Sequence, residues 1–167
     1  MSGQIQGCDD CHGTIEIAGV PGSDPDGRWC IYDLSPLLTD EEVRGNDRIM
    51  PLVPGRRPKP RRYDTTRYLL PIVFTGWTDD TGQPVARADA PARLVSTMAE
   101  FQAGLGIGPN RAAPTGDGTV AAVWLLPDGQ QWTTDLHVLR LRARRTAWGL
   151  WDGDLELSLP LPWSGAS

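Results

Sequence analysis

The sequence lacks any long apolar segment, because none of its apolar runs approaches the roughly 20 residues that a membrane-spanning helix needs. Its first residues also lack the basic start and apolar middle of a secretory signal peptide. Its three cysteines are an odd number, which excludes a complete set of internal disulfides. Together these absences predict a protein that has no membrane partner and is made in a reducing cytoplasm.

The usual signatures of an enzyme are missing as well. The sequence has neither a Gly-x-Ser-x-Gly elbow nor a His-Glu-x-x-His motif. Its two histidines, His12 and His137, do not stand near a serine or cysteine nucleophile in a recognisable pattern. Asp152, Asp154 and Glu156 alternate along the last predicted strand, which favours a solvated or interface face over an acid–base pair. We therefore predict no catalysis.

The charge of the chain is unevenly distributed. The net charge is -5 and the pI about 4.9, which argues against a nucleic-acid binder held by global charge. Yet residues 56–67 hold six basic residues and one acidic one, which leaves 10 basic and 20 acidic residues elsewhere. A basic arm at residues 44–67 on an acidic body suggests complementary contacts with copies of itself or with neighbours, although charge runs are often only solvated loops.

Alternating and apolar segments predict strands along most of the chain. Residues 68–75 are apolar on both faces, as in a strand buried between two layers, but Pro71 within them favours an edge or a bulge. The turn at residues 127–129 joins two segments as a hairpin. The predicted strands cover residues 14–18, 29–34, 68–75, 119–126, 130–140 and 149–161.

One helix is predicted between residues 89 and 106. Asp89 can cap it, Pro91 suits its first turn, and Gly104 and Gly106 end it. The fold class is therefore mainly β (α+β), a β-sandwich or barrel with one flanking α-helix. We expect an N-terminal extension at residues 1–28 and a single domain at residues 29–167. The apolar stripe of the helix consists of Leu94, Met98, Phe101 and Leu105.

Cys8 and Cys11 have the spacing of a zinc knuckle, because a tight turn can bring both thiolates to one tetrahedral ion. Cys30 is the candidate third ligand, and His12 or His137 the fourth. A structural zinc ion would staple the extension to the first strands. Two alternatives stay open: the pair forms a redox disulfide, or the cysteines are free thiols. Cys-x-x-Cys-His also matches a haem attachment pattern, which the lack of an export signal disfavours.

The segment from Arg44 to Gly76 resembles the region of siphophage tail proteins where a charged strand leads through a Pro-Gly loop into an apolar strand. The resemblance is to distal tail proteins and, more broadly, to small minor tail proteins of phages that infect actinobacteria. It continues through the helix and the hairpin and covers roughly residues 29–162. Two features depart from it: the Cys8–Cys11 extension and the absence of a large C-terminal domain. It is carried mainly by Arg48, Ile49, Pro54, Gly55, Arg56 and Arg57.

The resemblance implies a tail-tube-like β-sandwich that forms hexameric rings around a DNA channel in a long non-contractile tail. Its partners would be further copies of itself and neighbouring tail proteins (tail tube, tape measure, baseplate or tail tip), with DNA only in transit. The protein would be made in the host bacterial cytoplasm and reside in the virion tail. The alternatives are a major tail tube protein and, from another class, a zinc-containing β-sandwich binding module.

A ring closes through heterologous contacts, so one face of a subunit must complement a different face of the next. A basic arm and an acidic body meet this condition. Prolines at 51, 54, 58 and 60 would hold the arm extended and reduce the entropic cost of ordering it. The predicted inter-subunit contacts are Arg56, Arg57, Lys59, Arg61, Arg62 and Arg67.

Overall fold

The computed structural model describes residues 12–38, 66–108, 118–160 and 163–165, and the backbone of 43–44, 48–49, 56–57 and 62–63. Its body contains one α-helix, α1 (Ala90–Gly104), and a short 3₁₀ helix, η2 (Ser35–Leu38). The strands of the body are β1 (Thr14–Ile17), β2 (Val20–Pro21), β3 (Trp29–Ile31), β8 (Thr66–Thr75), β9 (Val120–Leu125), β10 (Gln131–Ala147), β11 (Leu150–Leu159) and β12 (Ser164–Gly165).

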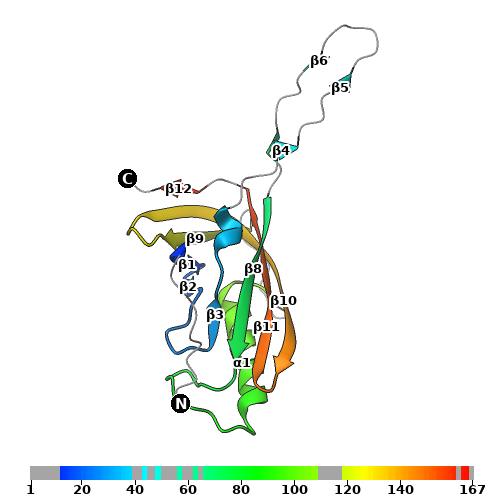
Figure 1. The fold of residues 1–167 in the computed structure, drawn as a ribbon. Helices are drawn as coiled ribbons and strands as arrows, with labels where there is room; N and C mark the ends of the chain where they lie inside the picture. Colours follow the sequence, from blue (N-terminus) through cyan, green and yellow to red (C-terminus); the bar gives the residue numbers. More distant parts are fainter. Residues whose placement is uncertain are drawn as a thin grey trace.

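These strands form one curled antiparallel sheet in the order β2-β1-β9-β10-β11-β8-β3, with β12 beside β10 (Figure 1). Strand β10 is long enough to serve both halves of the sheet. Its residues 131–136 pair with β9, and its residues 137–147 pair with β11. The two ends of the sheet are also linked, because the Ile31 N–H donates to the Gly22 carbonyl and the Asp24 N–H to the Trp29 carbonyl.

The core lies inside this curl because the strands alternate apolar side chains inward and polar side chains outward. In β8 the inward residues are fully buried, whereas the outward Leu69 is half exposed. In β11, the leucines predicted to share one face are buried from Leu155 to Leu159. The largest fully buried side chains are Trp124, Phe74, Phe101, Ile17, Leu70, Ile72, Leu94, Leu136, Leu155 and Leu157.

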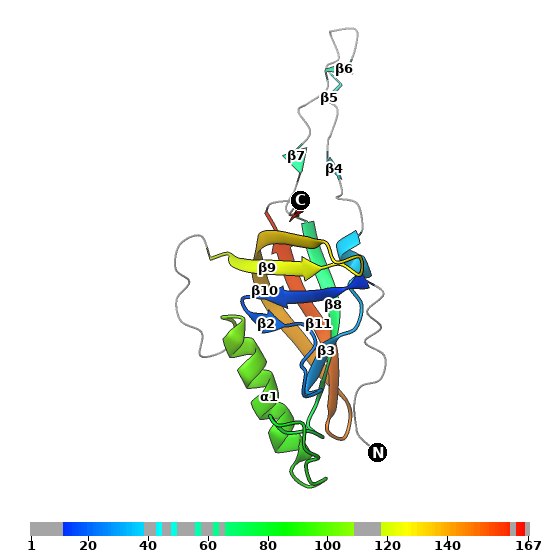
Figure 2. The same cartoon turned by 90° about the vertical axis from the view of Figure 1, so that its left-hand side faces the viewer.

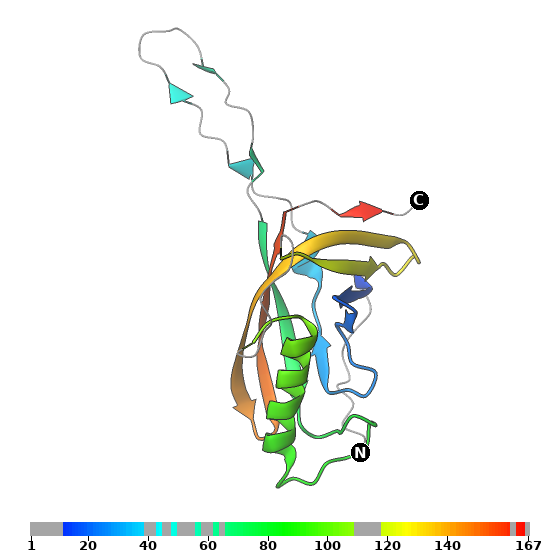
Figure 3. The same cartoon turned by 180° about the vertical axis from the view of Figure 1, so that it is seen from behind.

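The helix α1 packs alongside the sheet, as Figures 2 and 3 show from two sides. Its predicted stripe is confirmed: Leu94, Phe101 and Leu105 are buried, and Met98 packs against the core. Asp89 occupies the N-cap position, but its side chain makes no capping hydrogen bond. No helix among the described residues is long and apolar enough to cross a membrane. The fold is mainly β with one flanking helix, as the sequence predicts.

Two expectations need correction. Residues 14–21 form β1 and β2 inside the sheet, and Ile15 and Ile17 lie in the core, so the boundary at residue 28 does not separate an extension from the domain. Strand β8 is not buried on both faces, because the outward Leu69 is half exposed. It lies between β11 and β3, but β3 pairs only with its residues 72–74, so β8 is a local edge before Ile72. Pro71 is tolerated there because the pairing with β3 ends at Ile72, one residue away.

Candidate interaction surface

The basic arm leaves the body at the end opposite the start of α1 and the turn between β10 and β11 (Figures 1 and 2). Its described parts are four short strands: β4 (Val43–Arg44), β5 (Arg48–Ile49), β6 (Arg56–Arg57) and β7 (Arg62–Tyr63). They pair antiparallel as β4 with β7 and β5 with β6, and neither pair joins the sheet of the body. The described arm is therefore a two-stranded ribbon.

The predicted contact residues fall into three groups, of which one lies on this ribbon. Arg56 and Arg57 form β6, and Arg62 belongs to β7. Lys59 and Arg61 lie outside the described residues, as do the prolines at 51, 54, 58 and 60. The sixth residue, Arg67, is on β8 in the body. Its guanidinium lies 3.5 Å from the carboxylate of Glu156, so it already has a partner within its own chain.

Glu156 is the centre of a charged row on the outer face of the sheet. Its buried carboxylate accepts a short hydrogen bond from Arg140 of β10 and faces Arg67 of β8 on the other side. The hydrogen bond from Arg140 lowers the pKa of Glu156, and the charges of Arg140, Arg67 and Arg142 act in the same direction against the effect of burial. Glu156 is thus held as an anion between two cations.

The neighbouring positions of the β10–β11 hairpin continue this pattern. Arg142 is directly opposite Asp154, and Arg144 is opposite Asp152, with 3.3 Å between the Nε atom of Arg144 and the Oδ1 atom of Asp152. The three acids share one face of β11, as their alternation predicts, but Glu156 is buried there and not solvated. The arginine row itself was not predicted, although arginines at every second position of a strand opposite alternating acids could have indicated it.

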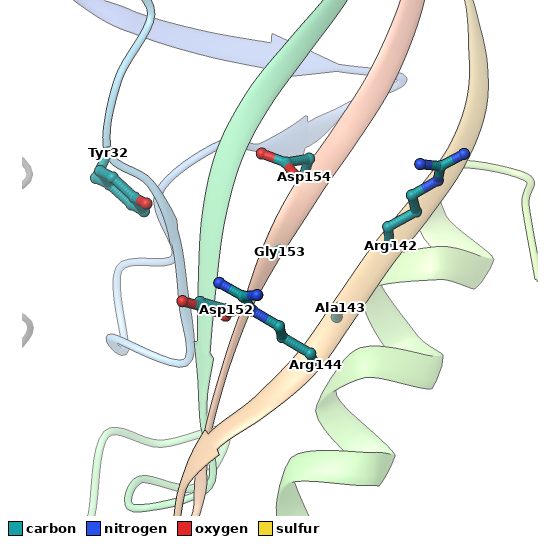
Figure 4. Close-up of a pocket in the computed structure, with 7 residues that line it drawn as sticks. All are labelled: Tyr32, Arg142, Ala143, Arg144, Asp152, Gly153 and Asp154. Atoms are coloured by element: carbon teal, nitrogen blue, oxygen red, sulfur yellow. Dashed lines mark hydrogen bonds and ion pairs between the residues drawn. The ribbon is translucent and has the colours of Figure 1, made fainter.

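Beside the charged row lies a shallow groove of about 330 Å³. Figure 4 shows Tyr32 of the chain after β3 on one side, Arg142 and Arg144 on the other, and the two aspartates of β11 between them. The groove is lined by equal numbers of arginines and aspartates, so its chemistry is that of a polar protein contact rather than of an apolar ligand pocket. It is lined by Tyr32, Arg142, Ala143, Arg144, Asp152, Gly153 and Asp154.

A second charged cluster links the β2–β3 hairpin to the helix, with Arg28 and Asp24 buried and Glu100 at the surface. Arg28 donates from Nε to Asp24 over 2.9 Å and from Nη1 to Glu100 of α1 over 2.8 Å, and its guanidinium lies over the ring of Trp29. The hydrogen bond to Asp24 raises the pKa of Arg28, and the negative charges of Asp24 and Glu100 raise it further. Burial acts in the opposite direction but is outweighed. All of its partners lie within the chain, so this cluster stabilises the fold.

The structure describes only some of the proposed zinc ligands, and one of these, Cys30, is otherwise engaged. Cys30 is buried and disulfide-bonded, and a sulfur atom in a disulfide is not a thiolate ligand, which corrects its assignment to zinc. Cys8 and Cys11 lie outside the described residues. The His12 carbonyl accepts a hydrogen bond from the indole of Trp124, and the His137 ring contacts the Gly118 carbonyl. Within the described residues no three metal-ligating side chains come together.

Comparison with known proteins adds no relative from which a function could be transferred. No protein-family model, curated protein or solved structure matches the chain. The arm and the charged row are therefore the features from which a function can be proposed.

Proposed function

We propose that this protein is a structural subunit that assembles with copies of itself into a ring, in the manner of a distal or minor tail protein of a long-tailed phage. The observation that carries the proposal is the basic two-stranded ribbon on an otherwise acidic chain. The resemblance of residues 29–162 to siphophage tail proteins suggests assembly into a ring. The ribbon gives a physical reason why copies of the chain would associate.

An isolated two-stranded ribbon is only marginally stable in water, because it has no second layer against which to bury side chains. The described strands of the arm are two residues long and pair only with each other. Such a ribbon gains stability when it lies on a surface of opposite charge. The rest of the chain has twice as many acidic as basic residues, so a neighbouring copy can offer that surface.

This contact is heterologous, because the arm of one copy meets the body of another, and repetition of a heterologous contact closes a ring or continues as a filament. We expect a closed hexameric ring in a tail, with tail proteins above and below it. A major tail tube protein would use the same contacts but would also stack on itself many times.

Negative-stain imaging and sedimentation velocity over a range of protein concentrations test the proposal. We expect rings with an open centre at high concentration, and stacks of such rings would favour the tube protein over the distal protein. A protein that remains monomeric at the highest concentration in both measurements contradicts assembly from identical copies.

The arm is tested by reversing the charge of Arg61 and Arg62 together, which we expect to abolish the rings. The matched control reverses Arg87 and Arg145, two exposed arginines of the body, and should leave the rings intact. Rings that form equally well in both double variants would show that the arm is not the contact, even if the protein is a ring subunit.

A further inference from the structure

The curled sheet has one long edge that no described strand covers. Strand β10 has β9 on one side along residues 131–136, and β11 on its other side along residues 137–147. At Arg140–Arg145, no backbone partner is found among the described residues on the side of β10 where β9 pairs with residues 131–136. An open edge of this kind presents unpaired N–H and C=O groups and is a template for another strand.

The regular part of this edge is Arg140–Arg145, because the register with β11 shifts on either side of it. The backbone direction follows from Gly153, where an added Cβ would lie 1.9 Å from the Arg142 carbonyl oxygen, so this oxygen points toward β11. Since alternate residues of an antiparallel strand direct their hydrogen-bonding groups to opposite sides, Leu141, Ala143 and Arg145 direct theirs to the open edge.

Charge alternates from strand to strand across the outer face of the sheet. Arg67 of β8 is followed by Glu156 of β11 and then by Arg140 of β10. The same order of an acid on β11 and an arginine on β10 holds at Asp154–Arg142 and Asp152–Arg144. The next strand outward would place its side chains beside a row of three arginines, and opposite charges on neighbouring strands stabilise a sheet.

The arginine row also determines which strands are disfavoured. A second copy of β10 would place arginines opposite arginines, and the basic arm of another copy would bring further positive charge. Both arrangements are destabilised by repulsion between like charges. The edge is therefore protected against pairing with itself while it remains open to an acidic strand.

We propose that the edge Arg140–Arg145 of β10 binds an extended acidic segment of a different protein, which adds to the sheet as a further strand. The backbone of Leu141, Ala143 and Arg145 provides the hydrogen bonds, and the side chains of Arg140, Arg142 and Arg144 select acidic residues at alternate positions of the segment. This inference does not depend on ring formation, because the edge belongs to each single copy.

A synthetic peptide of eight residues that alternates glutamate and valine tests the proposal in a binding titration with the full chain. We expect binding of this peptide, at least tenfold weaker binding of the matching lysine–valine peptide, and a similar loss when alternate amides of the glutamate peptide are methylated. The methylated peptide keeps its charge but loses the donors that strand addition needs.

Equal binding of the methylated and unmethylated peptides would reduce the effect to charge attraction and overturn the proposal. So would equal binding of the lysine peptide, or tighter binding of a single-stranded oligonucleotide than of the glutamate peptide. In the protein, Arg142→Glu should weaken binding at least tenfold. Arg87→Glu, at an exposed arginine just before α1 and outside the edge Arg140–Arg145, should not change it.

A backbone variant locates the contact. Ala143→Pro removes one N–H group that points to the open edge and leaves the hydrogen bonds to β11 in place, as proline is tolerated on edge strands. We expect it to abolish peptide binding at an unchanged melting temperature. If the variant does not fold, hydrogen exchange of the unmodified protein decides: peptide must slow exchange at Leu141, Ala143 and Arg145, and unchanged exchange there overturns the proposal.

Discussion

The body and the arm of this protein differ in where their backbone hydrogen-bonding groups and charged side chains find partners. In the body, β11 is paired on both sides, β8 is paired with β11 along its whole length, and buried charges such as Arg28 have partners within the chain. In the arm, each described strand is two residues long and pairs with one other strand. The body therefore contains the interactions that stabilise it, whereas the function proposed above assigns the partners of the arm to another molecule.

This difference gives the two regions separate roles. A sheet that surrounds a core of large aromatic and leucine side chains is stable on its own, because apolar burial is the main favourable contribution to folding. A ribbon without a core contributes little to that stability. Changes in the body should therefore alter the free energy of unfolding, and changes in the arm should alter assembly. Each prediction below tests one side of this separation.

The largest effect is expected at Phe101, which joins the helix to the sheet. Its ring lies 5.4 Å from that of Trp29 and 5.2 Å from that of Phe74, and it is fully buried. Phe101→Ala should lower the free energy of unfolding by about 3–5 kcal/mol, because it leaves a cavity between the helix and the sheet. Chemical denaturation measures this change.

The control for Phe101 is Val95→Ala on the exposed side of the same helix, where 58% of the residue is accessible to solvent. This substitution should change the unfolding free energy by less than about 0.5 kcal/mol. Alanine is the better helix former at both positions, so helix propensity cannot cause a loss in either variant. A similar loss in both variants would therefore mean that the effect at Phe101 is not specific to its packing against Trp29 and Phe74.

A somewhat smaller loss is expected from Arg28→Ala. The side chain of Asp24 is 3% exposed, and the substitution leaves its carboxylate without the guanidinium that holds it. Breaking a buried pair in this way should cost about 3 kcal/mol in unfolding free energy. Arg87→Ala, at an exposed position of the body, is the control. Equal stability of the two variants would show that the buried cluster does not hold the β2–β3 hairpin to α1.

The sequence predicts the body better than the contacts on its surface. The helix stripe from Leu94 to Leu105 and the hairpin at residues 127–129 are local patterns, so their periods and turn residues are enough to predict them. Pro71 indicates an edge in β8 but not its extent, because where the neighbouring strand ends is a property of the assembled sheet.

The sequence predicts the acidic residues of the charged row but not their arginine partners. The alternation of Asp152, Asp154 and Glu156 predicts a shared outward face, and the structure places all three on it. Their arginine partners depend on the register of β10 with β11, which includes a shift between Val138 and Arg140. Such a bulge changes which residues lie opposite each other on the two strands. It has no local sequence pattern, so the pairing of the arginines with the acids cannot be predicted from the sequence.

Glu156→Gln should destabilise the body less than Arg28→Ala, because the arginines that contact Glu156 are largely exposed and screened by solvent. The pKa of Glu156 is lowered in the folded protein, so its contribution is present above the pKa of the unfolded chain and is lost as the pH falls through the lower folded value. The difference in unfolding free energy between variant and parent should therefore be largest near pH 7 and vanish in acid.

Thermal unfolding of both proteins from pH 7 down to pH 2 measures this dependence. Asp135→Asn, at an exposed acid on β10 without a described ion pair, is the matched control for the loss of one carboxylate charge. A difference between Glu156→Gln and the parent that stays constant over the whole range would show that the carboxylate charge contributes nothing to the pairing of β8, β11 and β10.

The smallest effect on stability is expected from the largest change in the chain. Replacing residues 45–61 with a short glycine–serine linker removes most of the arm but none of the described contacts of the sheet. Shortening a loop to about half its length changes its closure entropy by only about 0.6 kcal/mol, so the unfolding free energy of the body should change by less than about 1 kcal/mol. Assembly should be lost completely in sedimentation velocity. A truncated protein that unfolds several kcal/mol more easily would mean that the arm packs on its own body, and the division of the molecule into a stable body and an assembling arm would be wrong.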